Sequence, residues 1–354
     1  MSRSKPIKAA VIIIVLVLGI ACISGCGGAG EVSGTEDAGK VVSETETELV
    51  IIDQAGREVT VKKEPKSIAL CYRVIIRFLL SLEQGDKITG IGKSEPFLEQ
   101  LQPSLKECAD VGQGVADIEA LAELKPDLFF HKASDIETLE AVEQIGIPAI
   151  GIDVETPEDM IKALKIMGKV CGAEEKANRL IQYYNDCIKK AEKLIANIPD
   201  KDKKTAIVMG TSIGKIADGT MLQGEMLERA GAINCGANLE ATELWPTAGT
   251  EQIFEWNPEY IFITGSESAV YDAEDIYEDK VWAEIEAVKK KNVYVMPAEQ
   301  DSWEFPGLVS ALGIEYMMHV MYPEILDDGQ LQEDVNELYE LCYGVSFDRQ
   351  ELGY

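Results

Sequence analysis

The chain contains one arrangement typical of a catalytic nucleophile, Gly210-Thr-Ser212-Ile-Gly214. In a nucleophile elbow, a helix begins directly after the serine and aims its hydroxyl at the substrate. Here the residues Lys-Ile-Ala-Asp-Gly follow, and they favour a turn over a helix. His131 and His319 are the two available imidazole bases. A secreted α/β serine hydrolase using Ser212 is therefore retained only as an alternative, and we expect no enzyme.

Metal and nucleotide chemistry have little support in the sequence. A bare transition metal needs several converging imidazole or carboxylate ligands, and two histidines do not supply such a cluster. No CxxC spacing indicates structural zinc. Gly112-Gln-Gly114 neither follows a predicted strand nor opens a helix, so it is not a nucleotide fingerprint. We expect no resident metal or cofactor, and we expect His319 to be structural.

A group of aromatic and cationic residues is predicted to lie at one rim of the fold. Ligands of open α/β sheets bind beyond the carboxyl ends of the strands, and each residue of the group follows a predicted strand or lies in a nearby loop. Aromatic faces with a cation or an imidazole suit a large, flat, partly apolar ligand. Taken singly, each tryptophan fits ordinary packing equally well. The predicted ligand-binding residues are Tyr72, Arg73, His131, Trp245 and Trp303.

Two stretches 132 positions apart have the same pattern. Each predicts a short helix, a proline that ends it, and an apolar β-rich run. The first runs from Glu119 through Pro126, and the second from Glu251 through Pro258. Such a repeat predicts two similar lobes with a functional site between them. Glu119 and Glu251 fit ordinary helix N-termini, with Asp117 and Thr250 as expected caps, but they also form a matched pair that a partner with two basic sites would recognise.

The alternation of predicted elements indicates an α/β fold in which each lobe has a mainly parallel sheet covered by helices. A hairpin is predicted over 49–61 around Gly56, and one long helix over 173–199 is expected to join the lobes rigidly. The predicted folded regions are an N-terminal lobe (49–172), the connecting helix (173–199) and a C-terminal lobe (200–354).

The first residues have the pattern of a secretory signal. Arg3, Lys5 and Lys8 precede an apolar run that ends in Ser-Gly-Cys26, and this run is short for a membrane span. Residues 1–26 are therefore predicted to be a signal peptide. The stretch 27–48 contains few large apolar residues and is predicted to be a flexible tether.

The net charge and the cysteine content limit the possible partners and the possible disulfides of the protein. The net charge of −29 becomes −29 − 3 = −32 without the three signal-peptide cations. Nucleic acid is an improbable partner because phosphate binding needs a basic surface. Beyond the signal and Cys26, six cysteines remain, and their thiols either stay free or pair in one of 15 ways.

The sequence resembles the class III solute-binding proteins of ABC importers, which capture ferric siderophores, haem or cobalamin. The resemblance covers nearly the whole mature body and includes the Asp53-Gln-Ala-Gly56-Arg opening, the duplicated E-x7-P-[DE] unit and the long helix. The run Ile23-Ser-Gly-Cys26 resembles a bacterial lipobox, which implies lipid attachment at Cys26. Together these features imply an extracytoplasmic, membrane-anchored monomer.

The resemblance also implies roles for individual residues. Glu119 and Glu251 match the family glutamates that pair with arginines of the permease dimer. The run from Trp245 resembles the cobalamin-binding branch, but His131 stands where that branch has a cleft tryptophan. An iron chelate, either a ferric siderophore or haem, is therefore the first choice of ligand, and a corrinoid (cobalamin) is the alternative.

Overall fold

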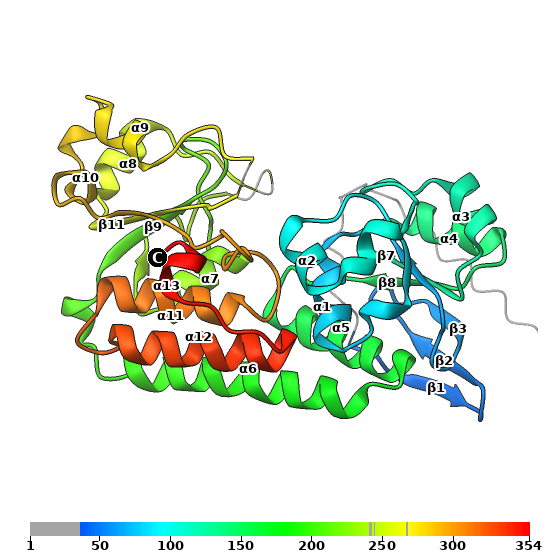
Figure 1. Ribbon diagram of the computed structural model, residues 1–354. Coiled ribbons are helices and arrows are strands. Elements are labelled where there is room, and N and C mark those ends of the chain that lie inside the picture. The colour runs from blue at the N-terminus through cyan, green and yellow to red at the C-terminus, as the bar shows by residue number, and fades with distance from the viewer. Residues whose placement is uncertain (1–35, 241–242, 244, 267) are drawn as a thin grey trace, which may run out of the picture. The chain divides into compact units, whose positions relative to one another are not determined.

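The computed structural model describes residues 36–240, 243, 245–266 and 268–354 (Figure 1). The predicted signal peptide and Cys26 lie outside these residues. The chain first forms an antiparallel three-stranded sheet from β1 (Val41–Glu44), β2 (Glu48–Ile52) and β3 (Glu58–Lys62). β2 and β3 confirm the predicted hairpin. β1 lies inside the predicted tether, so that prediction is wrong there, because Val41 and Val42 supply β-branched residues to a strand that pairs with β2.

The first lobe has a parallel five-stranded sheet in the order β6-β5-β4-β7-β8. The strands at 68–70, 128–132 and 149–152 are mostly apolar and buried, as expected for a parallel sheet covered on both faces. The strands are β4 (Ile68–Leu70), β5 (Ile88–Ile91), β6 (Ala109–Asp110), β7 (Leu128–Lys132) and β8 (Ala149–Ile152). The helices are α1 (Val74–Ser81), α2 (Pro96–Leu101), α3 (Ile118–Leu124), α4 (Ile136–Gln144) and α5 (Pro157–Cys171).

The second lobe has a parallel four-stranded sheet in the order β10-β9-β11-β12. Helices again follow the strands, which confirms the predicted α/β class and the two similar sheets. The strands are β9 (Thr205–Met209), β10 (Ile233–Asn234), β11 (Tyr260–Ile263) and β12 (Val293–Val295). The helices are α7 (Leu222–Arg229), α8 (Thr250–Trp256), α9 (Ala273–Glu278), α10 (Glu286–Lys289), α11 (Ser310–Met321), α12 (Asp328–Tyr343) and α13 (Arg349–Leu352).

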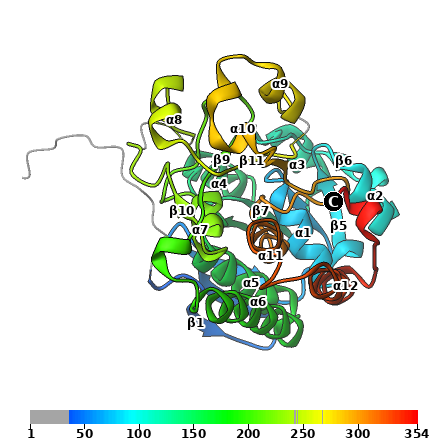
Figure 2. The same ribbon diagram turned by 90° about the vertical axis from the view of Figure 1, so that its left-hand side faces the viewer.

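The helix α6 (Glu174–Ile195) occupies the predicted connecting segment. It packs against α5 of the first lobe and against α7 and α11 of the second, and Figure 2 shows α5 and α6 side by side. One hydrophobic cluster continues through both lobes, because it includes Leu70 and Phe78 together with Leu338 and Tyr339. The lobes therefore share buried apolar surface in addition to the connecting helix.

The repeated unit has the same backbone geometry in both lobes. α3 and α8 each span seven residues, and each ends at a residue in the left-handed region, Lys125 (φ 50°, ψ 57°) and Asn257 (φ 45°, ψ 57°). β7 and β11 then follow Pro126 and Pro258. The N-caps differ, because Asp117 accepts a hydrogen bond from the Ala120 amide whereas Gly249, and not the predicted Thr250, precedes α8.

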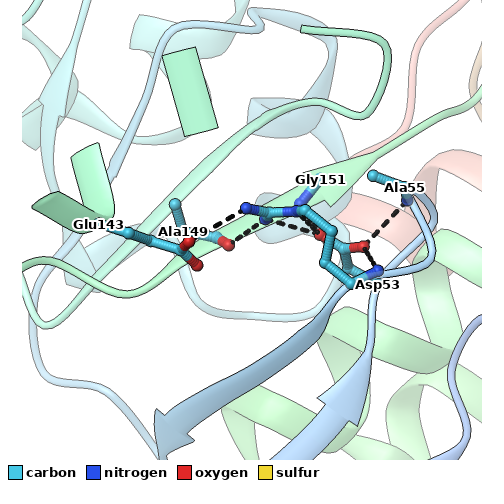
Figure 3. Close-up of polar contacts among 6 residues, drawn as sticks. Asp53, Ala55, Glu143, Ala149 and Gly151 are labelled. Carbon is cyan, nitrogen blue, oxygen red and sulfur yellow. Dashed lines mark hydrogen bonds and ion pairs between the residues drawn. The ribbon is translucent and has the colours of Figure 1, made fainter. Parts of the chain in front are cut away.

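The Asp53-Gln-Ala-Gly56-Arg57 turn fastens the hairpin to the first lobe (Figure 3). The buried Asp53 carboxylate accepts hydrogen bonds from the Ala55 and Gly151 amides and from the Arg57 guanidinium, with an Nη2–Oδ2 distance of 2.7 Å. Arg57 also donates to the Ala149 carbonyl at 2.6 Å. The Ala149 carbonyl and the Gly151 amide both belong to β8, so this motif fixes the strand that leads to the loop at 153–156.

Candidate ligand-binding cleft

A polar cleft of about 450 Å³ is lined by residues of both lobes. The first lobe contributes the segments after β4 and β5, and the second contributes the segments after β11 and β12. All four segments leave the carboxyl ends of parallel strands, which is where ligands bind in open α/β sheets. The volume lies within the range of small-molecule sites. The lining residues are Arg73, Arg77, Lys93, Ser94, Glu95, Pro96, Phe97, Gly265, Ser266, Ser268, Ala298, Glu299, Gln300, Ser302 and Phe305.

The wall from the first lobe is cationic. Arg73 and Arg77 both contact the Glu95 carboxylate, Arg73 Nε at 3.2 Å and Arg77 Nη2 at 2.5 Å. Lys93 is exposed and has no ion-pair partner among the described residues. This wall therefore offers one free ammonium and the remaining donors of Arg73 to an incoming ligand.

Arg77 joins the two lobes at the base of the cleft. Its Nε lies 2.5 Å from the Oδ1 atom of Asp301, a fully buried carboxylate on the loop after β12. Asp301 also accepts from the Tyr343 hydroxyl at 3.4 Å. The two carboxylates raise the pKa of Arg77 further above its already high value, although burial acts in the opposite direction. The guanidinium therefore stays charged and holds the lobes together through a buried ion pair.

The wall from the second lobe is built mostly from small polar groups. Ser266, Ser268, Gln300 and Ser302 line it, and Phe305 supplies an aromatic surface. Such a wall makes hydrogen bonds to a polar ligand but offers little flat apolar area.

Two larger grooves lie elsewhere on the surface. One of about 790 Å³ is formed by the C-terminal end of α6 and the residues around Tyr322, and one of about 910 Å³ by α6, α12 and Glu83. Neither is lined by residues at the carboxyl ends of the strands of both sheets. The smaller cleft is therefore the better candidate.

The predicted ligand-binding residues have different positions. Arg73 lines the cleft. Tyr72 is half-buried at the rim of the first lobe, where its hydroxyl lies 3.4 Å from Glu155 and the Lys132 ammonium lies 5.8 Å from its ring centre. Trp245 is half-buried and packs on Gly210, at the end of β9. Tyr72 and Trp245 thus lie at strand ends without belonging to the cleft lining.

Trp303 and His131 are enclosed by the protein, which corrects their prediction as ligand contacts. Trp303 is 0% exposed, and its indole N–H donates to the Tyr339 hydroxyl at 3.1 Å. His131 is 2% exposed, and its Nε2 atom lies 2.9 Å from Asp135 Oδ2 while its ring stacks on Phe129. The Trp303 indole N–H is satisfied within the fold, whereas the His131 Nδ1 atom is buried without a hydrogen-bond partner among the described residues. Both side chains are enclosed, so neither is presented to a ligand.

The remaining candidates also have defined surroundings. After Ser212 the chain forms a turn and an isolated bridge at Ile216, and no helix begins there, so the nucleophile elbow is absent from this segment. His319 Nδ1 donates to the Leu326 carbonyl at 2.9 Å, and its Nε2 atom lies 3.1 Å from Asp328, as expected for a structural residue. Within the described residues, no group of three or more His, Cys, Asp or Glu side chains has the arrangement of a metal site.

The six cysteines of the described region are all free thiols. Burial raises the pKa of Cys71, Cys171 and Cys342 to about 12, so these thiols stay protonated and unreactive at neutral pH.

Over the part of the chain that the structure describes, no helix combines the length and apolar character that a bilayer span requires.

Glu119 and Glu251 occupy equivalent places in the two lobes. Each is the second residue of its helix, α3 or α8, and each is exposed. Neither has an ion-pair partner among the described residues. Two free carboxylates therefore stand at matching helix N-termini.

Sequence reasoning missed most of the cleft. Lys93, Ser94 and Ser302 carry no pattern that separates them from ordinary loop residues. The one available signal was position, because each lies shortly after the end of a strand.

Two related sheets with a polar cleft at their strand ends define a two-lobed solute-binding protein, a class that binds and does not catalyse. The chain belongs to the periplasmic binding protein family, whose model matches residues 68–300. Among solved structures, a periplasmic solute binding protein from Veillonella parvula superposes with a TM-score of 0.75 at 24% identity, covering 85% of this chain and 94% of that one. The protein is thus an extracytoplasmic-type binding protein of the kind that serves ABC importers.

The curated relatives differ in their ligands. The uncharacterized ABC transporter substrate-binding lipoprotein YvrC of Bacillus subtilis is 26% identical over 87% of this chain and 96% of its own length. The molybdate-binding protein MolA of Haemophilus influenzae is 26% identical over 84% and 92%. The iron(3+)-hydroxamate-binding protein YxeB of Bacillus subtilis is 24% identical over 79% and 86%.

Proposed function

We propose that this protein is a lipid-anchored receptor that binds an iron chelate in the cleft between its lobes and delivers it to an ABC importer. The observation that carries the proposal is the cleft itself, which both lobes line. Arg73 and Lys93 belong to its first-lobe wall, and three serine side chains together with Glu299 belong to its second-lobe wall. Charged donors form strong hydrogen bonds to anionic oxygens, and the oxygen-rich surface of a ferric siderophore supplies many of them.

Among the ligands considered, a ferric siderophore fits this lining better than haem or a corrinoid. Phe97 and Phe305 are the aromatic side chains of the cleft, and they leave little flat apolar area for a porphyrin. A corrinoid is much larger than a drug-sized ligand, whereas about 450 Å³ lies near the lower end of the usual range. The likeness to an iron(3+)-hydroxamate-binding protein agrees with a siderophore.

A tryptophan fluorescence titration tests the ligand class. The panel contains a ferric trihydroxamate, haemin, cyanocobalamin and molybdate. We expect a saturable change with the ferric trihydroxamate. Lys93→Glu should weaken that binding at least about tenfold, because the reversed charge repels the ligand oxygens. The matched control is Lys40→Glu, an exposed lysine outside the cleft, which should leave the affinity unchanged. A response to haemin, cobalamin or molybdate alone would reject the iron siderophore.

Glu119 and Glu251 are proposed to dock on the permease dimer, one from each lobe. Reversal of both charges should abolish uptake in cells while the affinity for the ferric trihydroxamate stays the same. The control pair is Glu48→Lys and Glu228→Lys, two exposed glutamates outside the repeated unit. Weaker ligand binding in the Glu119/Glu251 variant, or normal uptake, would contradict this assignment.

Cys26 is proposed to carry the lipid anchor. Cys26→Ser should release the protein from the membrane fraction and abolish labelling by a radioactive fatty acid. Cys22→Ser, four residues earlier, is the matched control and should keep both the label and the membrane association. Membrane association of Cys26→Ser would refute the anchor.

A further inference from the structure

Glu304 is a buried carboxylate whose partners are all neutral. Its side chain is 0% exposed. One carboxylate oxygen accepts from the Thr264 hydroxyl at 2.5 Å and from the Gly265 amide at 3.1 Å, and the other accepts from the Ser302 hydroxyl at 3.1 Å. Among the described residues, no lysine, arginine or histidine forms an ion pair with it. Burying such a group is costly unless hydrogen bonds compensate, and here three donors surround it.

These donors belong to the wall of the cleft. Gly265 and Ser302 line the cleft directly, and Thr264 accepts a hydrogen bond from the amide of the next lining residue, Ser266, at 3.1 Å. The Glu304 carbonyl is in turn held by the Gln223 side chain of α7 at 2.8 Å. Glu304 therefore connects the end of β11 with the loop after β12, and it does so from behind the surface that a ligand touches.

The local backbone leaves little freedom for another arrangement. A Cβ atom at Gly265 would lie 2.3 Å from the Met296 carbonyl oxygen and 2.5 Å from the Ala298 Cβ. Gly265 is thus required for the close approach of the two strand ends. The hydrogen bond from its amide to Glu304 fixes the direction of this peptide.

The carboxylate also sets the polarity of Ser302. The Ser302 hydroxyl donates to the Glu304 carboxyl group, so its hydrogen is directed inward. Its remaining lone pairs then face outward, and toward a ligand Ser302 acts as an acceptor.

We propose that Glu304 is a positioning residue that fixes the second-lobe wall of the cleft and makes Ser302 a hydrogen-bond acceptor for the ligand. The inference rests on the proposed function for the identity of the cleft as the ligand site. Its structural part, the organisation of residues 264–266 and 302 by one carboxylate, is independent of which ligand binds.

The decisive change is Glu304→Gln, which keeps the size and removes one acceptor. When the amide oxygen replaces the atom that binds Thr264 and Gly265, the amide nitrogen faces Ser302. Ser302 must then accept from the amide and turn its own hydrogen toward the cleft. The polarity that the ligand meets is reversed at one position without a change in shape.

Two measurements test the proposal. In the ligand-free protein, hydrogen exchange should accelerate about tenfold at the amides of Gly265 and Ser266 in Glu304→Ala, which removes the acceptor of the Gly265 and Thr264 hydrogen bonds. Affinity for a ferric trihydroxamate with backbone amide N–H groups should fall about tenfold in Glu304→Gln, because Ser302 no longer accepts from such a donor. The fall should be less than threefold when Glu304→Gln is added to Ser302→Ala, because the two changes act through one hydroxyl. The matched control is Glu315→Gln, a buried carboxylate of the same lobe outside the cleft, which should change neither quantity.

The possible outcomes separate the two proposals. Unchanged exchange in Glu304→Ala, or an equal loss of affinity in Glu304→Gln with and without Ser302, overturns the positioning role. Failure of the wild-type protein to bind the ferric trihydroxamate overturns the proposed function, and the exchange data then decide the positioning role alone. If Glu304→Ala does not fold, Thr264→Val removes a single donor and should accelerate exchange at the same two amides to a smaller extent.

Discussion

The two lobes repeat each other down to individual hydrogen bonds at the start of their sheets. In the first lobe, the Asp127 amide donates to the Ser67 hydroxyl at 2.9 Å, and the Asp127 carboxylate accepts from the Lys66 amide. In the second, the Glu259 amide donates to the Thr205 hydroxyl at 3.2 Å, and the Glu259 carboxylate accepts from the Thr205 amide. An acidic residue after each helix-ending proline thus locks the strand to its neighbour.

The lobes differ at the opposite, ligand-facing ends of the strands. In the first, the Glu95 carboxylate of the cleft is neutralised by Arg73 and Arg77. In the second, the buried Glu304 carboxylate has three neutral donors, and burial raises its pKa while these hydrogen bonds act against the rise. The repeated ends therefore maintain the fold, and the divergent ends give the two cleft walls different chemistry.

The largest effect is expected from Arg77→Met, which removes the buried cation between the lobes. Asp301 would then be a buried carboxylate without its cation, and breaking such a pair costs about 3–5 kcal/mol. Urea unfolding measures the loss. Arg73→Met is the control on the same segment, because that more exposed pair contributes no more than about 1 kcal/mol. An equal loss of unfolding free energy in both variants would show that the buried Asp301 carboxylate does not need the Arg77 cation.

Asp53→Ala should have a somewhat smaller effect, on the order of 2–3 kcal/mol. Arg57 keeps some solvent contact and the Glu143 carboxylate, so its charge is less isolated than that of Asp301. Urea unfolding provides the value, with the exposed Asp37→Ala as the control. A loss below about 1 kcal/mol would show that the Asp53 turn does not anchor the first lobe.

Glu315 should make the stability of the second lobe depend on pH. Burial, followed by the nearby Asp334 carboxylate, raises its pKa to about 8, although Lys190 acts in the opposite direction. The ordinary pKa of this carboxyl is 4.5, so the folded state binds the proton more tightly than the unfolded state does. The stabilisation that this proton gives the folded state is complete below about pH 4.5 and is lost as the pH rises to about 8. Wild-type stability should therefore fall relative to Glu315→Gln over this range, by at most about 1.4 kcal/mol per pH unit.

Chemical unfolding at several pH values checks this prediction. The exposed Glu119→Gln serves as the control and should follow the wild-type protein at every pH. A difference between wild type and Glu315→Gln that stays constant from pH 4.5 to 8 would contradict the assignment.

The smallest expected effect compares the two helix ends of the repeat. Lys125 has a positive φ without a compensating side-chain bond in the C-cap, so Lys125→Gly should stabilise the protein by about 0.5–1 kcal/mol. Asn257 has the same conformation, but its side-chain oxygen accepts from the Glu286 amide at 2.9 Å. Asn257→Gly should therefore give no gain in stability. Thermal unfolding of both variants distinguishes them, and an equal gain would mean that the Asn257 bond contributes nothing.

Most of the fold was predictable because apolar periodicity and turn residues are local signals. The repeated helix, proline and strand were located correctly, and α6 fell within the predicted range. α5 was missed although its signals are present, since Thr156 caps it, Pro157 begins it and Gly172 ends it in the left-handed region.

The site was harder to predict because loop side chains have no fixed period. Trp303 was chosen for its aromatic type and its place after a strand, but the loop turns it inward, where Tyr339 satisfies its N–H. The same loop presents the neighbouring Ser302 to the cleft. Lys93 and Ser302 are brought together by tertiary packing between segments more than 200 residues apart. Propensity and spacing do not contain that information.

A crystal structure of the protein with a bound ferric trihydroxamate tests the central claim most directly. The account predicts that the chelate lies between Lys93 and Ser302 and contacts both lobes. A chelate bound to one lobe alone, or in the groove beside Tyr322, would contradict it.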